Sequence, residues 1–220
     1  MTLGLKKTIH HALELNELET VAEMAKKDRK VLSLLVRLAY DKNTLVGWRA
    51  IKAAGLTAQA IVKTDYDFLR ETCRRLLWSL TDESGGIGWA APELLGEIVS
   101  SDPDRFRDLF PIIAGAYDIE EKVFRPGVMY ALGRIARVDP ALIVPFKDLI
   151  ERALSDEDPL VRIFALDLYK TFKNFLEISD QNNFKKIVTN MLTDSSEVWV
   201  YKQDGFVSME VREAAKSSIG

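Results

Sequence analysis

Residues that commonly build disulfides, metal sites and nucleophilic centres are scarce in this sequence, which has one cysteine and two histidines among 220 residues. Because Cys73 stands alone, no internal disulfide can form, and we expect it to be a buried apolar side chain. His10 and His11 are adjacent, so they point to different sides of a helix and cannot form an i, i+4 metal pair. Neither a serine nucleophile elbow nor a cysteine cluster is present. We therefore expect no catalytic residue, no metal and no cofactor.

Long apolar runs and an excess of one charge are also missing. No segment approaches the ~20 uninterrupted apolar residues of a membrane span, and the N-terminal stretch MTLGLKKTIHHALEL carries charge where a signal peptide needs an apolar run. Thirty basic and 33 acidic residues give a net charge of −3, with the two signs interleaved along the chain. These features, with the lone cysteine, predict a cytoplasmic protein without a membrane partner, and they disfavour nucleic acid as a partner.

An internal repeat is the main feature of what is present. Five times, a helix-like segment ends in Asp, a short gap follows, and a second helix-like segment begins that often ends on Gly. The aspartates are 41, 36, 38 and 38 residues apart, at Asp41, Asp82, Asp118, Asp156 and Asp194. A period of this size is typical of a two-helix repeat stacked into a solenoid. Solenoids present extended surfaces to other molecules, which does not by itself identify the function.

The spacing of apolar residues predicts helices almost throughout. Asp-Pro pairs at 102–103, 139–140 and 158–159 mark helix starts, because Asp caps free backbone N–H groups and Pro tolerates the first turn. The first helices of the repeats are predicted at 30–41, 65–82, 103–118, 140–155 and 178–194. The second helices are predicted at 44–62, 88–100, 125–138, 159–175 and 208–220. Pro92 predicts a late helix start, whereas Pro111 and Pro145 predict kinks.

Two segments depart from the repeat. Residues 1–29 are predicted to form two short amphipathic helices that cap the array. The fifth repeat contains 12 extra residues within EVWVYKQDGFVSM, where apolar segments on both sides of Gln203-Asp204-Gly205 predict a β-hairpin. We therefore predict one domain over 1–220. Its repeats cover about 30–62, 65–100, 103–138, 140–175 and 178–220.

The second helices share a pattern, which reads VGWRAIKAAG, IGWAAPELLG, FRPGVMYALG, VRIFALDLYK and VREAAKSSIG. This pattern resembles the HEAT repeat, particularly the HEAT-like units of phycobilisome lyases. The resemblance implies an all-α, right-handed α-α superhelix, a HEAT-like solenoid that here carries one β-hairpin insertion near the C-terminus. It also implies a ladder in which Arg125, Arg162 and Arg212 join the repeated aspartates, weakened where Gly47 and Gly88 replace Arg.

Small residues in the same pattern are expected to allow close packing. The buried face of the second helices is rich in Ala, which permits helices to approach within and between repeats. Gly55, Gly96 and Gly133 recur near the end of the pattern, where we expect neighbouring backbones to come close. A glycine inside a helix costs ~1 kcal/mol relative to Ala, so a packing reason is needed.

The second helices line the concave side of HEAT-like arrays, and residues four apart on them share a face. The residues proposed to bind a partner on this face are Trp48, Lys52, Trp89, Glu93, Tyr130 and Arg134. Trp48 and Trp89 occupy equivalent positions in consecutive repeats, so two exposed indoles with Tyr130 next in line would form a platform for a peptide. The alternative is that both tryptophans fill space in the interior.

Two other segments are candidate contact elements. Trp199 and Tyr201 on the hairpin are proposed to contact a partner at one edge of the array; the alternative is a hairpin that decorates or covers the last repeat. Three glycines in the loop at 82–88 could bring N–H groups to an anion, or form only a flexible turn. The lysine of a phosphate-binding P-loop is absent from this loop.

These observations favour a non-catalytic scaffold or adaptor that binds another protein or peptide along the second helices. Two alternatives rest on the resemblance alone. One is a bilin lyase-like or tetrapyrrole-handling protein. The other is a HEAT-like alkylpurine DNA glycosylase, in which Trp89, Glu93 and Arg134 would imitate the Trp, acidic residue and Arg of the concave face.

Overall fold

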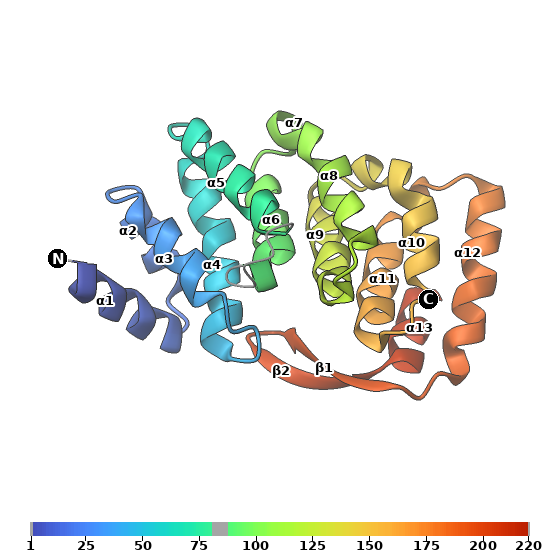
Figure 1. Ribbon diagram of the computed structural model, residues 1–220. Helices are drawn as coiled ribbons and strands as arrows, with labels where there is room; N and C mark the ends of the chain where they lie inside the picture. The colour runs from blue at the N-terminus through green and yellow to red at the C-terminus, as the bar shows by residue number, and fades with distance from the viewer. Residues whose placement is uncertain (1, 81–87, 220) are drawn as a thin grey trace. The chain divides into compact units, whose positions relative to one another are not determined.

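The computed structural model describes residues 2–80 and 88–219, which are helical apart from one β-hairpin near the C-terminus (Figure 1). The predicted all-α class with a hairpin insertion is thus confirmed. The helices form two compact units, Met1–Ala116 and Tyr117–Gly220. Each unit is described by itself, and the single domain over 1–220 stays a prediction. Across the described ranges, no helix is both long and apolar enough to cross a membrane.

The first unit begins with two short helices and continues with helix pairs. Its elements are α1 (Thr2–Glu14), α2 (Leu18–Ala25), α3 (Lys30–Leu38), α4 (Leu45–Ile61), α5 (Tyr66–Ser79), the 3₁₀ turn η1 (Gly88–Ala90), α6 (Ala91–Val99), α7 (Pro103–Phe106), the 3₁₀ turn η2 (Arg107–Leu109) and α8 (Phe110–Gly115). The two helices predicted within residues 1–29 are present as α1 and α2, and their role as a cap stays a prediction. Residues 82–87 of the glycine-rich loop lie outside the described residues.

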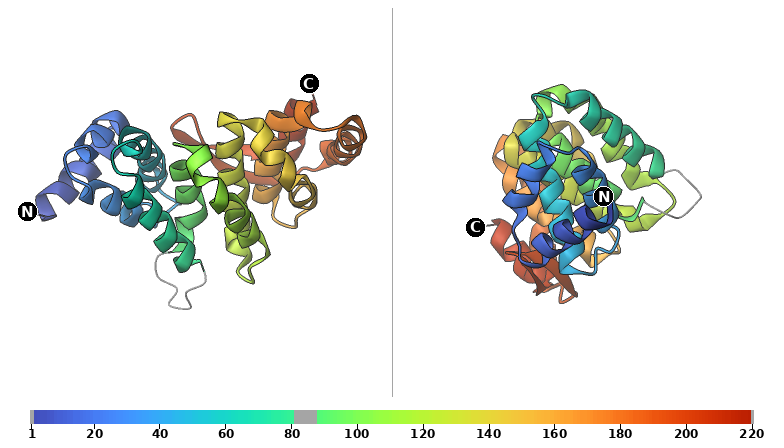
Figure 2. Two further views of the ribbon diagram at one scale, coloured as in Figure 1. Left: turned by 90° about the horizontal axis from the view of Figure 1, so that it is seen from above. Right: turned by 90° about the vertical axis from the view of Figure 1, so that its left-hand side faces the viewer.

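Helix α4 is the centre of the first unit. It packs against α2 and α3 on one side and against α6 on the other, and α6 also packs against α5 (Figures 1 and 2). Ala50, Ala53, Ala54 and Ala58 of α4 are fully buried. Because these side chains are single methyl groups, the α4 backbone can lie close to its neighbours, as the Ala-rich pattern predicts.

The second unit continues the helix pairs and ends with the hairpin. Its elements are η3 (Ala116–Asp118), η4 (Lys122–Phe124), α9 (Arg125–Val138), η5 (Pro140–Phe146), α10 (Lys147–Ala153), α11 (Pro159–Phe172), η6 (Lys173–Phe175), α12 (Ile178–Asn190), η7 (Met191–Thr193), β1 (Glu197–Lys202), β2 (Gly205–Glu210) and α13 (Val211–Ile219). Helix α11 packs between α9 and α13. Rings of Tyr169, Phe172 and Phe184 join α11 to α12, with centroids of the stacked Tyr169–Phe184 pair 5.3 Å apart.

Proline and aspartate set the helix ends in both units. Asp102, Asp139 and Asp158 each accept a hydrogen bond from a backbone N–H of the following first turn, which confirms the predicted starts. The first helix predicted at 103–118 is broken into α7, η2 and α8, with Pro111 in the first turn of α8. Pro145 lies inside η5, so regular α-helix begins only at α10. Both results follow from the missing N–H of proline.

The hairpin is an antiparallel pair in which Lys202 faces Gly205 across a two-residue turn. The turn residues Gln203 and Asp204 both have positive φ, 50° and 64°, as in the primed turns that suit hairpins. The strands are longer than predicted, and β2 includes residues 208–210. The last helix therefore begins at Val211 instead of residue 208.

Candidate functional site

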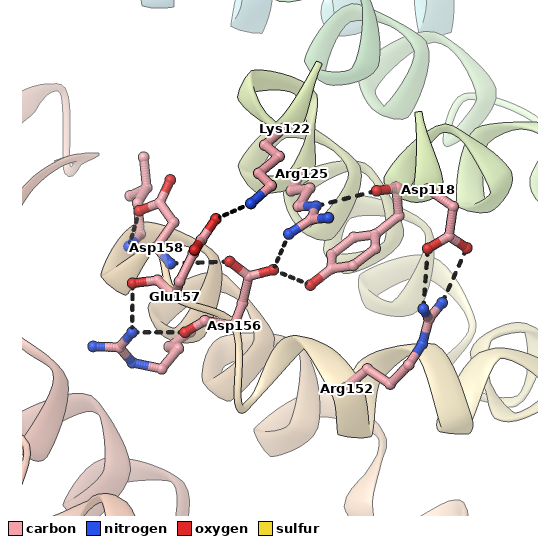
Figure 3. Close-up of polar contacts among 10 residues, drawn as sticks. Asp118, Lys122, Arg125, Arg152, Asp156, Glu157 and Asp158 are labelled. Atoms are coloured by element: carbon pink, nitrogen blue, oxygen red, sulfur yellow. Dashed lines mark hydrogen bonds and ion pairs between the residues drawn. The ribbon is translucent and has the colours of Figure 1, made fainter. Parts of the chain in front are cut away.

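A network of hydrogen bonds and ion pairs joins successive helix pairs of the second unit (Figure 3). Asp156, which follows α10, accepts hydrogen bonds from the Tyr117 hydroxyl and from Nη1 of Arg125 on α9, the latter at 3.1 Å. Nε of Arg125 also donates to the backbone carbonyl of Tyr117 at 3.3 Å. Beside this centre, both Nη atoms of Arg152 bind the carboxylate of Asp118 at 3.0 and 3.1 Å. Arg125 and Arg152 thus join the segment around Tyr117 to α10 and to the residues that follow it.

The electrostatics of this centre keep Asp156 ionised. Burial of the Asp156 carboxylate by itself raises its pKa, but hydrogen bonds from Tyr117 and from the backbone N–H of Asp158, together with the charge of Arg125, outweigh it and lower the pKa. Burial and the neighbouring carboxylate raise the pKa of the Tyr117 phenol, so this phenol stays a hydrogen-bond donor. The Tyr117 hydroxyl and the Arg125 guanidinium thus both bind the Asp156 carboxylate, and we interpret this contact as structural.

A second rung repeats the arrangement one helix pair later. Nε of Arg162 donates to Asp194 Oδ2 at 3.0 Å, and Nη1 of Arg162 donates to the backbone carbonyl of Asp156 at 2.7 Å. The predicted Arg–Asp ladder is therefore confirmed for Arg125 and Arg162, whereas Arg212 pairs with Glu210. Gly47, at the corresponding position of the first unit, leaves no room for a side chain, because an added Cβ would meet the Asp41 carbonyl oxygen.

Two buried carboxylates on α6 form the corresponding polar contacts of the first unit. Glu93 and Glu97 are each 2% exposed. Nζ of Lys42 lies 2.8 Å from Glu93 Oε1, and Nζ of Lys52 lies 2.8 Å from Glu97 Oε1. The two lysines come from α4 and the segment before it, so both ion pairs join α4 to α6. Buried ion pairs of this kind fix the register of two helices, and removing one partner costs several kcal/mol.

Two residues of the proposed binding face are buried. Trp48 is 7% exposed and lies in the first turn of α4, so its indole packs in the interior, as the alternative interpretation allowed. Glu93 is also buried, where Lys42 neutralises it. The expectation that these two side chains stand on the surface is thus corrected. The physical reason is that α4 and α6 pack against each other through this face, which is then unavailable to a partner.

The remaining residues of that face are at least partly accessible. Trp89 is 42% exposed and lies in η1, before α6 begins, so it does not share a regular helix with Glu93. Lys52 is half-buried by its pair with Glu97. Tyr130 and Arg134 are half-buried on α9 of the second unit, where the Tyr130 ring makes an edge contact with Phe164 at 5.8 Å. Of the six proposed residues, four belong to the first unit and two, Tyr130 and Arg134, belong to the second.

Only some of the exposed tryptophans were predicted from the sequence. Trp78 at the end of α5 is 66% exposed and Trp199 on β1 is 69% exposed. Trp199 was a candidate for an edge contact, and Tyr201 two residues on is half-buried against Phe206. Trp78 was missed. Its signal is present in the sequence, because it lies three and four residues after Arg75 and Arg74, on the polar stripe of an amphipathic helix.

The described residues contain few groups that could bind a metal or act as a nucleophile. Within residues 2–80 and 88–219, no three His, Cys, Asp or Glu side chains come together as metal ligands would. His10 and His11 both lie near Glu14, at 3.4 and 3.5 Å. Burial raises the pKa of the Cys73 thiol to about 12, so it is inert as a nucleophile at neutral pH.

Known proteins resemble this chain in structure and not in sequence. No protein-family model matches the chain, and no curated protein matches its sequence. Among solved structures, the chain is similar to an archaeal HEAT-like repeats protein from Thermococcus onnurineus NA1, with 14% identity and a TM-score of 0.39. The match covers 97% of this chain and 95% of the archaeal chain. The all-helical repeat fold of the present chain rests on the packing of helix pairs within each unit.

Proposed function

We propose that this chain is a non-catalytic scaffold that binds another protein through exposed aromatic side chains. The observation that carries the proposal is the placement of its tryptophans. Three of the four, Trp78, Trp89 and Trp199, expose 42% or more of their surface, and only Trp48 is buried. Leaving a large indole in water forgoes the free energy of its burial, whereas tryptophans at protein interfaces often supply the largest share of binding.

The organisation of the polar groups supports the same proposal. The buried charges, Glu93, Glu97 and Asp156, are each held by a lysine or arginine from a neighbouring segment. These charges stabilise the fold, which is what a rigid scaffold requires, and they are not presented to a substrate. A rigid surface binds with less loss of conformational entropy than a flexible one.

The two alternatives that rest on the resemblance have no specific observation in their favour. A DNA glycosylase role for Trp89, Glu93 and Arg134 would need Glu93 accessible to a base, but Glu93 is buried and paired with Lys42. A tetrapyrrole-handling role is tested directly by whether the purified chain takes up a bilin and its visible absorption. Retention of DNA at low salt tests the glycosylase role.

The decisive experiment is affinity capture from a lysate of the native host, with and without nuclease, read by mass spectrometry. The wild-type chain is compared with Trp78→Ala/Trp89→Ala and with Trp199→Ala. Ile178→Ala, which removes another exposed apolar side chain, serves as the matched control. We expect a stoichiometric protein that survives nuclease and that at least one tryptophan variant loses while the control retains it. Capture that disappears with nuclease, or capture equal in all variants, would contradict the proposal.

A further inference from the structure

Within the described ranges, the hairpin is a sheet of two strands, β1 and β2, that pair in one continuous register (Figure 1). In antiparallel strands, hydrogen-bonded residue pairs alternate with pairs whose N–H and C=O groups point away from the partner strand. Lys202 and Gly205 flank the two-residue turn, so they are a hydrogen-bonded pair. At the other end, the N–H of Val211 donates to the carbonyl of Ser196 at 3.0 Å. Both ends therefore give the same alternation along the strands.

The outer edge of β2 carries backbone groups that point away from β1. By this alternation they are the N–H and C=O groups of Phe206 and Ser208. In the part of the chain that the structure describes, none of these four groups takes part in a hydrogen bond to another backbone group. The groups that match such an edge are the N–H and C=O groups of another extended chain, which is why unprotected edges recruit strands.

β2 is the more open of the two strands. β1 packs against α11, and Nη2 of Arg162 donates to the hydroxyl of Ser196, just before β1, at 3.1 Å. Val200 of β1 is buried, whereas every residue of β2 is half-buried or exposed. Val207 and Ser208 are both exposed, although consecutive side chains of a strand lie on opposite faces. Both faces of β2 are therefore accessible beside its outer edge.

The sequence of β2 lacks the features that protect the edges of sheets. Natural edge strands are commonly blocked by proline, by a bulge or by a charged side chain within the strand. The register of the hairpin contains no bulge, and residues 205–209 (GFVSM) contain neither proline nor a charged residue. The charged residues of the hairpin lie at its base and at its turn, and they are Glu197, Lys202, Asp204 and Glu210.

We propose that the outer edge of β2 binds an extended, apolar segment of a partner protein, which adds a third strand to the hairpin. Main-chain hydrogen bonds with Phe206 and Ser208 align the segment, and its side chains alternate between the two faces of the sheet. The inference rests on the proposed function, because it gives the conformation and the chemistry of the partner that Trp199 contacts.

The side chains beside this edge determine which residues the added strand carries. Trp199 lies directly opposite Ser208 and is 69% exposed. Because Ser208 is small, the indole can extend across it toward an apolar side chain of the added strand, next to Phe206 on the same face. On the other face, Val207 is 36% exposed and offers its surface to a β-branched residue. The matching segment is therefore apolar on both faces.

A second copy of this chain is the competing occupant of the edge. If two β2 edges paired antiparallel about Ser208, each Ser208 would face its own copy and each Phe206 would face a Glu210. Two serines and a phenyl ring opposite a carboxylate offer little cross-strand stabilisation. Pairing about Phe206 would instead place Ser208 opposite Asp204 of the turn, which shortens the overlap. The edge therefore matches a foreign apolar strand better than it matches itself.

The test selects peptides without assuming their sequence. Phage-displayed random dodecapeptides are selected on the wild-type chain, and the recovered peptides are synthesised and titrated by fluorescence anisotropy. We expect sequences rich in Val, Ile, Phe and Tyr and poor in Pro, as strands are. Their affinity is expected to fall about tenfold in Trp199→Ala.

Ser208→Pro is the critical variant, because it removes an outward N–H and leaves the pairing with β1 in place. Proline is accepted in edge strands where the N–H faces outward. We expect affinity to fall about tenfold or more through the lost hydrogen bond and the obstructing ring.

Ser208→Ala is the matched control. It also removes the hydroxyl, which donates to Glu197, but it keeps the N–H. We expect it to bind the peptides within about twofold of the wild-type chain, because an exposed side-chain hydrogen bond contributes little. Slow amide exchange of Val200 and Val207 verifies that the hairpin is intact in both variants.

A second measurement tests the pairing from the peptide, independently of how proline affects the hairpin. The recovered peptides are N-methylated at one residue at a time. Only every second N–H of a paired strand faces its neighbour, so affinity should fall about tenfold at alternate positions and about twofold or less between them. The amides of Phe206 and Ser208 should also exchange more slowly when the peptide is bound.

Each contrary outcome has a distinct meaning. No recovered peptide, equal binding of every recovered peptide to Ser208→Pro, or no alternation in the N-methyl series would overturn the inference. A dimer of the wild-type chain that Ser208→Pro abolishes, measured by light scattering, would identify a second copy as the occupant and would also overturn it. If a host protein is captured through Trp78 or Trp89 and Ser208→Pro retains it, the scaffold function stands and the inference about β2 fails.

Discussion

A methyl group on Gly55 of α4 would lie 2.3 Å from Oε2 of Glu97 on α6 and 3.1 Å from its Cβ. Glu97 is buried and paired with Lys52 from the same helix as Gly55. Gly55 thus provides room for a buried carboxylate and not, as the repeat pattern suggested, for a neighbouring backbone. The ion pair and the glycine form one packing unit between the two helices.

Replacing Gly55 with Ala is therefore expected to destabilise the first unit. Alanine gains up to ~1 kcal/mol of helix propensity over glycine, but overpacking a buried contact typically costs about 1–3 kcal/mol. The Cβ and Cδ of Glu97 also lie only 3.1 and 3.2 Å from the added methyl group, so a rotation of the carboxylate alone does not relieve the contact. We expect a net loss of about 1 kcal/mol, measured as a lower urea midpoint.

Gly133→Ala is the matched control, since Gly133 occupies the same place in the repeated phrase on α9. An added Cβ at Gly133 would meet nothing within 4 Å. We expect this substitution to raise stability by about 0.5–1 kcal/mol through helix propensity. If both substitutions shift the urea midpoint in the same direction, the explanation for Gly55 is wrong.

Trp48 and Trp89 are expected to behave differently although the repeat makes them equivalent. Trp48→Ala removes a buried indole and should lower the free energy of unfolding by about 3–5 kcal/mol. Trp89→Ala removes a side chain that is 42% exposed and should cost about 1 kcal/mol. Thermal unfolding followed by circular dichroism measures both. Nearly equal losses would mean that Trp89 is as much a core residue as Trp48.

The difference between these tryptophans shows where sequence reasoning succeeds and where it fails. The resemblance to HEAT repeats implied a ladder of the repeated arginines and aspartates. Arg125 with Asp156 and Arg162 with Asp194 form such contacts, because a repeated register places the same residue types together in each copy. The same logic failed for Trp48 and Trp89. The α-helix begins at Leu45, before Trp48, but only at Ala91, after Trp89. The Trp48 side chain therefore projects from an α-helix, whereas the Trp89 side chain projects from a 3₁₀ turn.

A contact that occurs in only one repeat also cannot be predicted from the repeat pattern. Gly55 and Gly133 look alike in sequence, and only the position of Glu97 distinguishes them. Burial of Glu93 and Glu97 could not be predicted either, because carboxylates are seldom buried unless a cation reaches them. The cations here are Lys42 and Lys52, which lie 51 and 45 residues away along the chain. In contrast, the exposure of Trp78 follows from the helical stripe it shares with Arg74 and Arg75.

Asp156 is predicted to make stability depend on pH at the acidic end. Its folded-state pKa is lowered below the usual value of 3.8, so the stability it contributes is present above that pH and is lost as the pH falls through the folded pKa. Asp156→Asn should lower the free energy of unfolding by about 2 kcal/mol at pH 7, since hydrogen bonds to a charged group are replaced by weaker ones.

The pH dependence of the Asp156→Asn effect is the critical measurement. Urea unfolding of the wild-type chain and the variant at pH 7, 5 and 3 should give a constant difference between pH 7 and 5 and a smaller one at pH 3. Tyr117→Phe is the companion variant, because it removes one hydrogen bond to Asp156 while leaving Arg125 in place. It should cost about 1 kcal/mol. A difference that stays the same down to pH 3 would show that the charge of Asp156 contributes nothing.

The turn of the hairpin provides a last prediction, which joins local structure to the proposed binding role of Trp199. A two-stranded hairpin is only marginally stable. Here Gln203 and Asp204 both adopt positive φ, which costs most side chains about 1–2 kcal/mol, Asn and Asp less, and Gly least. Gln203→Asn/Asp204→Gly should therefore slow amide exchange of β1 and leave partner capture intact. Gln203→Val, which places a β-branched residue at positive φ, should accelerate that exchange and weaken capture in the same sense as Trp199→Ala. Capture unaffected by Gln203→Val, despite faster exchange of β1, would show that an ordered hairpin is not needed to present Trp199.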